Sequence, residues 1–201
     1  MIDIGRLRIA LHGLHAGAAR AALPLLTALC ALGAEPAVAR EAAPFPARAG
    51  LELAREAALS WSTDARLIYV ENDEPLDPSG ASERWGYLFH SPALDRLRGY
   101  SVRDGKIVIA ENLEMKLEAP PVAMEWIDSG AALAAAEREV EDFREKHAET
   151  RLATMLLMRG PFLEKDPDET TWTLVYTAAG APPLFVVVEA TGGRVRRTWR
   201  G

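Results

Sequence analysis

The sequence has only one cysteine, Cys30, which lies inside an apolar run near the N-terminus. If this run is removed, the mature chain has no disulfide, no cysteine metal site and no cysteine nucleophile. Long basic runs are also missing, and the formal net charge is −6. The chain therefore lacks the electrostatic footprint of a nucleic-acid binder and the polybasic patch that binds anionic lipid.

The first forty residues contain the three parts of a secretory signal peptide. An arginine-containing start precedes the apolar run of residues 21–34, and Ala37 and Ala39 form a small-x-small cleavage pattern. The run is shorter than the ~20 residues that a membrane-spanning helix needs. We therefore expect cleavage after Ala39, an exported protein in the periplasm or outside the cell, and no transmembrane segment in the mature chain.

Two alternatives stay open for this segment. It could be an ordinary buried helix, because helical patterning alone allows one. Cys30 could instead carry a lipid that anchors the protein to a membrane, although Leu29 occupies a position where a small residue is expected.

The first half of the remaining chain predicts a helix followed by strands. Apolar residues recur at three- and four-residue steps over residues 47–61, which places them on one helix face. Strand-forming residues fill 64–70 and 85–89. Asp104-Gly105 lies between two further runs of this kind, and this pair is a strong hairpin signal.

The second half repeats this order, with Ser129 as the predicted N-cap of its helix. Corresponding residues are offset by 85 to 88 positions, as in Leu67 and Leu152, Trp85 and Trp172, and Gly105 and Gly193. Such self-similarity indicates a repeated structural unit. We therefore predict an α+β fold of two tandem modules, each with one helix packed on a small antiparallel β-sheet.

Pro120-Pro121 marks the joint between the modules, because adjacent prolines cannot continue a helix or a central strand. Each module has a limited core, so we expect the two to pack together. The predicted divisions are a signal peptide at residues 1–39, a first module at 40–118 and a second module at 119–201.

Alternate residues of the two tryptophan strands share a face of the sheet. We expect this face to meet the helices, because burying an aromatic ring stabilises the fold by roughly 2 kcal/mol or more. We expect the opposite face to be solvated or to form an interface between modules. The alternative is a functional aromatic cleft, formed by Trp85, Tyr87, Phe89, Trp172, Leu174 and Tyr176.

The order of these motifs resembles the PepSY-like superfamily. Residues 185–195 are especially similar, because a strand ends in an acidic-Ala-x-x-Gly turn that starts at Glu189 and leads into a last strand. The first half departs from this pattern, since residues 101–105 replace that turn. The resemblance implies a secreted or envelope α+β module that binds or restrains a partner, often a peptidase, and has no catalytic residues to carry over.

The sequence contains no recognisable catalytic motif. Its mature part has two histidines, His90 and His147, and neither lies in a motif with a nucleophile or in a metal-binding pattern. We expect His147 to cap or pack at the end of the second helix. The chain is therefore predicted to be no enzyme and to hold no cofactor and no metal ion.

The loops ahead of the two tryptophan strands, residues 71–78 and 164–169, are both acidic. Carboxylates suit calcium, but the spacing matches no EF-hand, so we expect solvated turns in which Asp and Pro set the local geometry. The residues that remain candidates for an interaction are Asp73, Asp77, Asp166 and Asp168.

The leading functional hypothesis is an exported, non-catalytic protein of the bacterial envelope that binds another protein, with a peptidase as one candidate. The alternative is a carrier that holds a small ligand in a cleft between the two modules, because pockets often form at such boundaries. An enzyme comes third, and it would need convergent polar residues that the linear sequence conceals.

Overall fold

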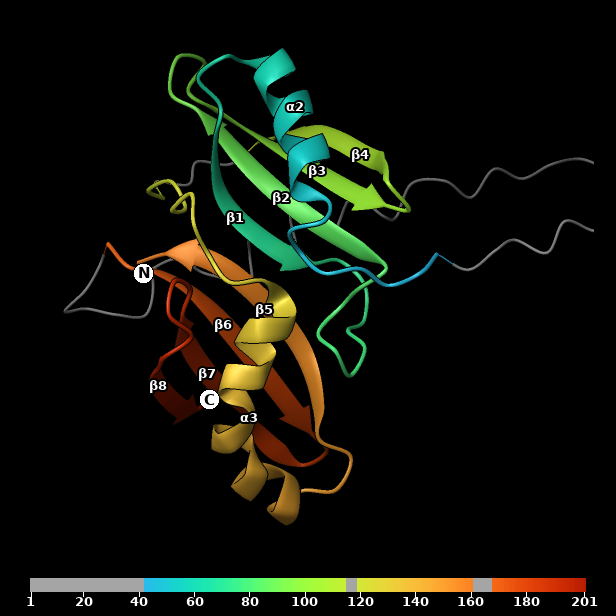
Figure 1. Cartoon of the computed structure of the whole chain (residues 1–201), viewed down its shortest axis with the longest axis vertical. Helices are drawn as coiled ribbons and strands as arrows, with labels where there is room; N and C mark the ends of the chain where they lie inside the picture. Colours follow the sequence, from blue (N-terminus) through green and yellow to red (C-terminus); the bar gives the residue numbers. More distant parts are fainter. Residues whose placement is uncertain (1–41, 115–118, 161–167) are drawn as a thin grey trace, which may run out of the picture.

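Eight strands form one antiparallel sheet, and two helices lie on the same face of it (Figure 1). This computed structural model describes residues 42–114, 119–160 and 168–201. The sheet order is β4-β3-β2-β1-β5-β6-β7-β8. In chain order, the elements are α2 (Leu51–Trp61), β1 (Arg66–Asn72), β2 (Arg84–Ser91), β3 (Arg96–Arg103), β4 (Lys106–Leu113), α3 (Ser129–Lys146), β5 (Arg151–Arg159), β6 (Thr170–Ala178), β7 (Ala181–Glu189) and β8 (Val195–Arg200).

The fold is mixed α+β and mostly sheet, as predicted, but one expectation needs correction. We predicted a small sheet for each half, whereas a single sheet runs through both halves. Its centre is an antiparallel pairing of β1 with β5, in which Tyr69 lies opposite Met158 and Glu71 lies opposite Leu156. A strand edge carries unpaired N–H and C=O groups, and joining the two central edges satisfies them.

Asn72 extends this central ladder with its side chain. The amide oxygen of Asn72 accepts a hydrogen bond from the N–H of Met155 (2.7 Å), and the amide nitrogen donates to the carbonyls of Glu74 (2.9 Å) and Ala153 (3.5 Å). Buried backbone groups need partners. The Asn72 amide therefore makes the hydrogen bonds to β5 that another pair of strand residues would have made, at the point where β1 turns away from β5.

The predicted Asp104-Gly105 hairpin is confirmed, because both residues have positive φ values, 49° and 65°, as a type I′ turn requires. The turn between β6 and β7 was not predicted. There Ala178 pairs with Ala181, and Gly180 has a φ of 70°. The prolines that follow Ala181 hid this hairpin from the sequence analysis, because proline is rare inside strands.

Trp85 and Trp172 lie fully buried between the sheet and the helices, with their rings in edge contact and their centroids 6.2 Å apart. The indole N–H of Trp85 donates to the carbonyl of Phe45 (2.7 Å), and that of Trp172 donates to the carbonyl of Ile127 (2.8 Å). Both acceptors lie ahead of a helix, so each indole fixes where a helix starts on the sheet. The aromatic face is therefore core and not a cleft, and its buried residues are Trp85, Tyr87, Phe89, Trp172, Leu174 and Tyr176.

The predicted N-cap of the second helix is wrong by one residue. Asp128 is the N-cap, and its carboxylate accepts hydrogen bonds from the N–H groups of Ser129 (2.8 Å) and Arg48 (3.0 Å). The buried Ser129 hydroxyl accepts the N–H of Ala47 (3.2 Å). Residues 47–50, which we assigned to the first helix, therefore precede α2, and Ala47 and Arg48 bind the start of α3.

The sheet face opposite the helices is buried at its centre, where residues of both halves pack together, so of the two states expected for this face the solvated one does not hold there. A bulge after Leu67 lets both Ile68 and Tyr69 join a buried cluster on this face. The Tyr69 hydroxyl donates to the buried carboxylate of Glu71 (2.6 Å). The buried members of this cluster are Ile68, Tyr69, Leu88, Leu97, Leu156 and Met158.

Asp64 ties the start of β1 to the turn between β2 and β3. Its carboxylate accepts hydrogen bonds from the hydroxyls of Ser62 (2.6 Å) and Ser91 (2.6 Å) and from the N–H of Ala93 (2.7 Å). These bonds, that from Ser62 first, lower the pKa of Asp64 from 3.8 to about 2. We had assigned Asp64 to the first strand, which instead begins at Arg66.

Neither of the two described helices is long and apolar enough to cross a membrane. Cys30, Ala37 and Ala39 lie outside the described residues. The signal peptide, the cleavage site and the division at residue 118 therefore stay predictions.

The first prediction concerns the indole hydrogen bonds. Trp85→Phe and Trp172→Phe should each lower the free energy of unfolding by about 2 kcal/mol, because each removes an indole hydrogen bond to the segment ahead of a helix and reduces core volume. Urea unfolding followed by circular dichroism measures the loss. Trp61→Phe is the control, because Trp61 lies part-buried at the end of α2. An equal loss at this position would contradict the role of the two core indoles.

The second prediction concerns pH. The pKa of Asp64 is lower in the folded chain than in the unfolded chain, so its carboxylate stabilises the fold above the unfolded pKa. That contribution is lost as the pH falls from about 4 to about 2. Asp64→Asn should therefore flatten the pH dependence of the unfolding free energy in this range. Glu139→Gln, on the exposed side of α3, is the control, and the prediction fails if both variants keep the wild-type slope.

Candidate functional site

A groove of about 440 Å³ lies on the helix side of the sheet, between α2 and the linker of residues 119–128. Its volume is within the range of small-molecule sites, roughly 300–1,000 Å³. In Figure 1, α2 and the yellow linker lie on either side of the first part of β1. The apolar lining comes from α2, β1, β2 and the linker, through Leu51, Leu59, Leu67, Phe89, Val122 and Met124.

The linker wall of the groove is held in place by hydrogen bonds to both halves of the sheet. A segment whose backbone groups already have hydrogen-bond partners keeps its position before a ligand binds, and it can therefore form a wall of a preformed site. The N–H of Val122 donates to the Leu67 carbonyl (2.8 Å), that of Ala123 to the Thr170 hydroxyl (3.0 Å), and that of Ile127 to the Ala190 carbonyl (2.6 Å).

Exposed apolar side chains gather at this groove. Met124 is 75% exposed and Leu59 is 41% exposed, and both line it. Large exposed apolar residues of the described chain also include Leu94 and Val108, which lie elsewhere. Single exposed apolar residues need no explanation, whereas two that line the same concave site make it a candidate binding surface.

Arginines form a basic rim around the groove. The guanidinium of Arg48 donates to the carbonyl of Trp126 and lies over its ring, 4.6 Å from the centroid. Arg55 pairs with Glu52, with 3.4 Å between Nε and Oε2. Arg66 also touches the groove, but it lies between Ala65 and Leu67, which pack on the helix side, so strand alternation turns its side chain to the opposite face of the sheet. The rim on the helix side, with Arg48, Arg55 and Glu52, has a net positive charge.

The first acidic loop uses its carboxylates for its own structure. Asp73 lies 3.8 Å from the Nε of Arg84 and accepts a hydrogen bond from the Ser101 hydroxyl. Asp77 accepts hydrogen bonds from the N–H (2.8 Å) and the hydroxyl (2.7 Å) of Ser79. The Asp77 contacts fit the expected turn, in which an aspartate bonds to nearby backbone. Asp73 departs from the expected solvated turn, because its side chain is 7% exposed and binds residues of β2 and β3.

The two acidic loops do not come together. Antiparallel pairing puts the end of β1 and the end of β5 at opposite ends of the strands. Asp168 therefore lies far along the sheet from Asp73, and it pairs with Arg159 (3.1 Å). Asp166 lies outside the described residues. Within the described ranges, no cluster of three or more histidine, cysteine or acidic residues could hold a metal ion.

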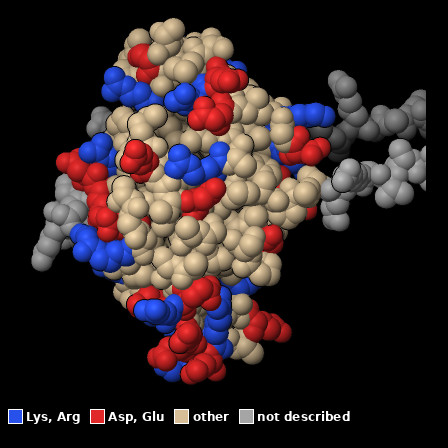
Figure 2. Space-filling model, in the orientation of Figure 1, with Lys and Arg blue, Asp and Glu red and all other residues tan. Residues whose placement is uncertain are grey.

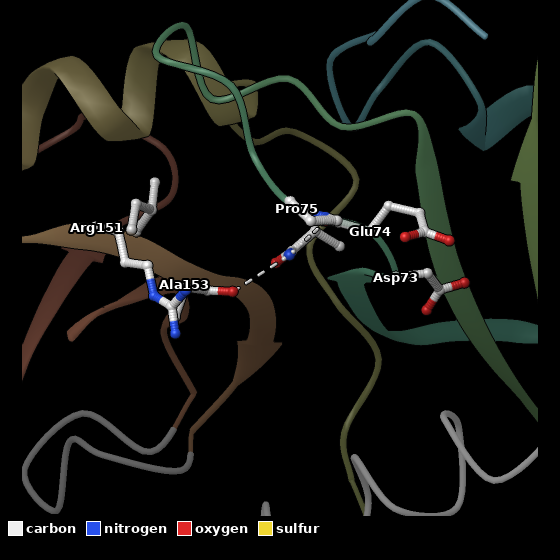
Figure 3. A pocket seen from close by; sticks show the side chains of 7 residues that line it. Asp73, Glu74, Pro75, Arg151 and Ala153 are labelled. Atoms are coloured by element: carbon white, nitrogen blue, oxygen red, sulfur yellow. Dashed lines mark hydrogen bonds between the residues drawn. The ribbon is translucent and has the colours of Figure 1, made fainter. Parts of the chain in front are cut away.

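A smaller hollow of about 290 Å³ lies where the end of β1 meets the start of β5 (Figure 3). Asp73, Glu74 and Arg151 line it, but Figure 3 shows both carboxylates pointing away from Arg151. The Glu74 carboxylate instead pairs with Arg84 (2.9 Å). The two carboxylates of this hollow therefore bind other residues of the protein, and neither of them faces Arg151.

The two histidines lie in different halves of the sheet and its helices. His147 is the C-cap of α3, its ring packs on Phe143 with centroids 4.8 Å apart, and its Nε2 lies 3.4 Å from Arg200. This confirms the predicted capping and packing role of His147. His90 lies part-buried on β2.

Basic and acidic side chains are interspersed over the helix side of the molecule (Figure 2). Around α3 many of them pair with each other, as Arg144 does with Glu137 and Lys146 with Asp142 (3.2 Å). A phosphate backbone is bound by a broad basic field, and this face of the molecule carries none.

The sequence analysis did not identify the residues that line this groove. Its signal was weak, because Met124 and Val122 follow Pro120-Pro121 in a segment with neither helical nor strand periodicity. Leu59 belongs to the predicted helix but lies off its buried face. Apolar residues that fit no period were therefore the available indication of a binding surface.

No protein-family model and no curated protein sequence matches the chain. Among solved structures, the fold is similar to that of a putative lipoprotein from Clostridium difficile 630, with a TM-score of 0.52 and 10% sequence identity. The match covers 76% of this chain and 93% of the other. At this identity the likeness shows a shared fold alone, and the PepSY-like resemblance stays a prediction.

The third prediction tests how the linker is held. Thr170→Val removes the hydroxyl that accepts the N–H of Ala123, so the free energy of unfolding should fall by about 1–2 kcal/mol. Thr173 is the matched control, because its buried hydroxyl has no hydrogen-bond partner. Thr173→Val should leave stability unchanged or raise it by up to about 1 kcal/mol. Equal losses in urea unfolding would show that Thr170 does not anchor the linker.

Proposed function

We propose that the protein is an exported, non-catalytic binding protein of the bacterial envelope, and that it binds its ligand in the groove between α2 and the linker. The observation that carries this proposal is the groove itself. It combines a linker wall fixed by hydrogen bonds, an apolar floor, the exposed side chains of Leu59 and Met124, and a basic rim. Binding sites of this kind are concave, mostly apolar and largely preformed.

Two observations support the proposal that the protein is exported. The basic start, the short apolar run and the Ala37-Val38-Ala39 pattern are typical of a signal peptide. The fold is shared with the Clostridium difficile protein, which is described as a putative lipoprotein and so fits an exported or envelope-associated chain. A lipid on Cys30 is the alternative form of attachment within this proposal.

A small ligand is favoured over a protein partner at this site. The groove is concave and lies beside the linker between the halves, where a small-ligand carrier was expected to have its cleft. Met124 supports the second candidate, a protein partner, because a side chain that is 75% exposed at a rim can enter another surface. The peptidase link rests on the PepSY-like resemblance alone.

We also infer that residues 40–118 and 119–201 are two copies of one unit. In each half a helix is followed by four strands, and the sheet order runs outward from β1 to β4 and from β5 to β8. Each half also has a buried tryptophan whose indole bonds to the segment ahead of the helix. The groove would then lie at the junction of the two copies.

Binding without chemistry fits the placement of the tyrosines with shifted pKa values. Burial raises the pKa of Tyr87 and of Tyr176, and both belong to the core under the helices. Perturbed groups often mark active sites when they line a cleft, but neither of these tyrosines lines the groove. The proposal therefore assigns no catalytic residue.

The fourth prediction tests the groove as a binding surface. Replacing Met124 with the photo-crosslinking residue p-benzoylphenylalanine should yield a covalent adduct on irradiation in the native host. The control places the same residue at Leu94, which is 46% exposed in the turn after β2. Mass spectrometry of the adduct distinguishes a small molecule from a protein, and the same sample shows whether the N-terminus is Arg40. If position 124 gives no more adduct than position 94, the proposed site is wrong.

A further inference from the structure

We infer that the ligand of the groove is a single-chain amphiphile with an anionic head, of the fatty-acid or alkyl-phosphate type. This inference rests on the proposed function, and it names the chemical class that the groove would take. It follows from the apolar floor, the charge of the rim and the state of the backbone in the walls.

The floor and the mouth of the groove are suited to an alkyl chain. Phe89 is buried to 1% exposure and forms the floor with Leu67, while Leu59 and Met124 stand exposed at the mouth. A chain laid along these side chains would remove the exposed pair from water. Each buried methylene should raise the affinity about fourfold, since it is worth about 0.8 kcal/mol.

The rim selects the charge of the head group. Arg48 is held by Trp126 and Arg66 turns to the opposite face of the sheet, so the arginine with an accessible guanidinium group is Arg55. Arg55 pairs with Glu52 at 3.4 Å, but their side chains are 45% and 69% exposed, and ion pairs this exposed are weak. An anionic head can therefore compete with Glu52 for Arg55. A cationic head would meet a rim of its own charge.

The backbone of the walls disfavours an extended peptide. A peptide strand binds by pairing with unpaired N–H and C=O groups along a sheet edge. One wall is the helix α2, whose backbone bonds to itself, and the other is the linker, whose N–H groups at Val122 and Ala123 donate to Leu67 and Thr170. The contacts that remain are made by side chains and have little directionality, which suits an alkyl chain.

Isothermal titration calorimetry of the purified exported protein tests this inference with four twelve-carbon probes below their micelle concentrations. Dodecanoate and dodecyl phosphate carry anionic heads, dodecanol is neutral, and dodecyltrimethylammonium is cationic. We expect both anions to bind more tightly than dodecanol by about fivefold, the effect of one accessible ion pair, and the cation to bind most weakly. Decanoate should bind more weakly than dodecanoate by about fourfold per methylene.

Variants test the contact with the head group separately from the contact with the alkyl chain. Arg55→Gln should weaken both anions by about fivefold and leave dodecanol unchanged. Met124→Ser should weaken all probes, because it removes apolar contact with the chain. Arg138→Gln, on the exposed side of α3 and outside the groove, is the control and should change nothing. Circular dichroism shows that each variant keeps its fold.

Two results overturn the inference and leave the proposed function standing. In the first, dodecanol binds as tightly as dodecanoate and Arg55→Gln has no effect, which removes the anionic head. In the second, no amphiphile binds while position 124 crosslinks to a protein. If no probe binds and position 124 gives no adduct above the Leu94 control, the proposed function fails as well.

Discussion

The antiparallel pairing of β1 with β5 sets the place of almost everything else in the structure. Few residue pairs make this junction, from Tyr69 with Met158 to Glu71 with Leu156, and the Asn72 side chain extends it. Because β1 and β5 are the inner edge strands of the two halves, the remaining strands extend outward on both sides, and both helices lie on one face. The same geometry brings Trp85 against Trp172 and sends the two acidic loops to opposite ends of the sheet.

The tryptophans connect this sheet to the groove. Each indole binds a carbonyl ahead of a helix, so it fixes that segment against the sheet. The segments then bind each other, since Asp128 caps α3 and also accepts the N–H of Arg48. The linker is thereby held over the first part of β1 at a distance from α2, and the space between them becomes the groove. The candidate site is thus a consequence of how the core positions the two helices.

Polar residues that attracted attention in the sequence are used by the structure itself. Asp77 folds its own turn, Asp73 pairs with Arg84, Asp168 pairs with Arg159, and His147 caps α3. The groove depends instead on apolar side chains and on the arginines of its rim. The proposed binding role rests on this division, since binding sites are mostly apolar with a few polar groups.

The sequence by itself determined the local features: the α+β composition, the Asp104-Gly105 turn, the buried aromatic face and the position of His147 at a helix end. These follow from periodicity and turn chemistry, which act over a few residues. Only the tertiary structure decided that the strands form one sheet, that Asn72 bonds to Met155 across 83 residues, and that a groove lies beside the linker. The physical reason is that the unpaired N–H and C=O groups of a strand edge are the same in every strand and do not encode which strand pairs with them.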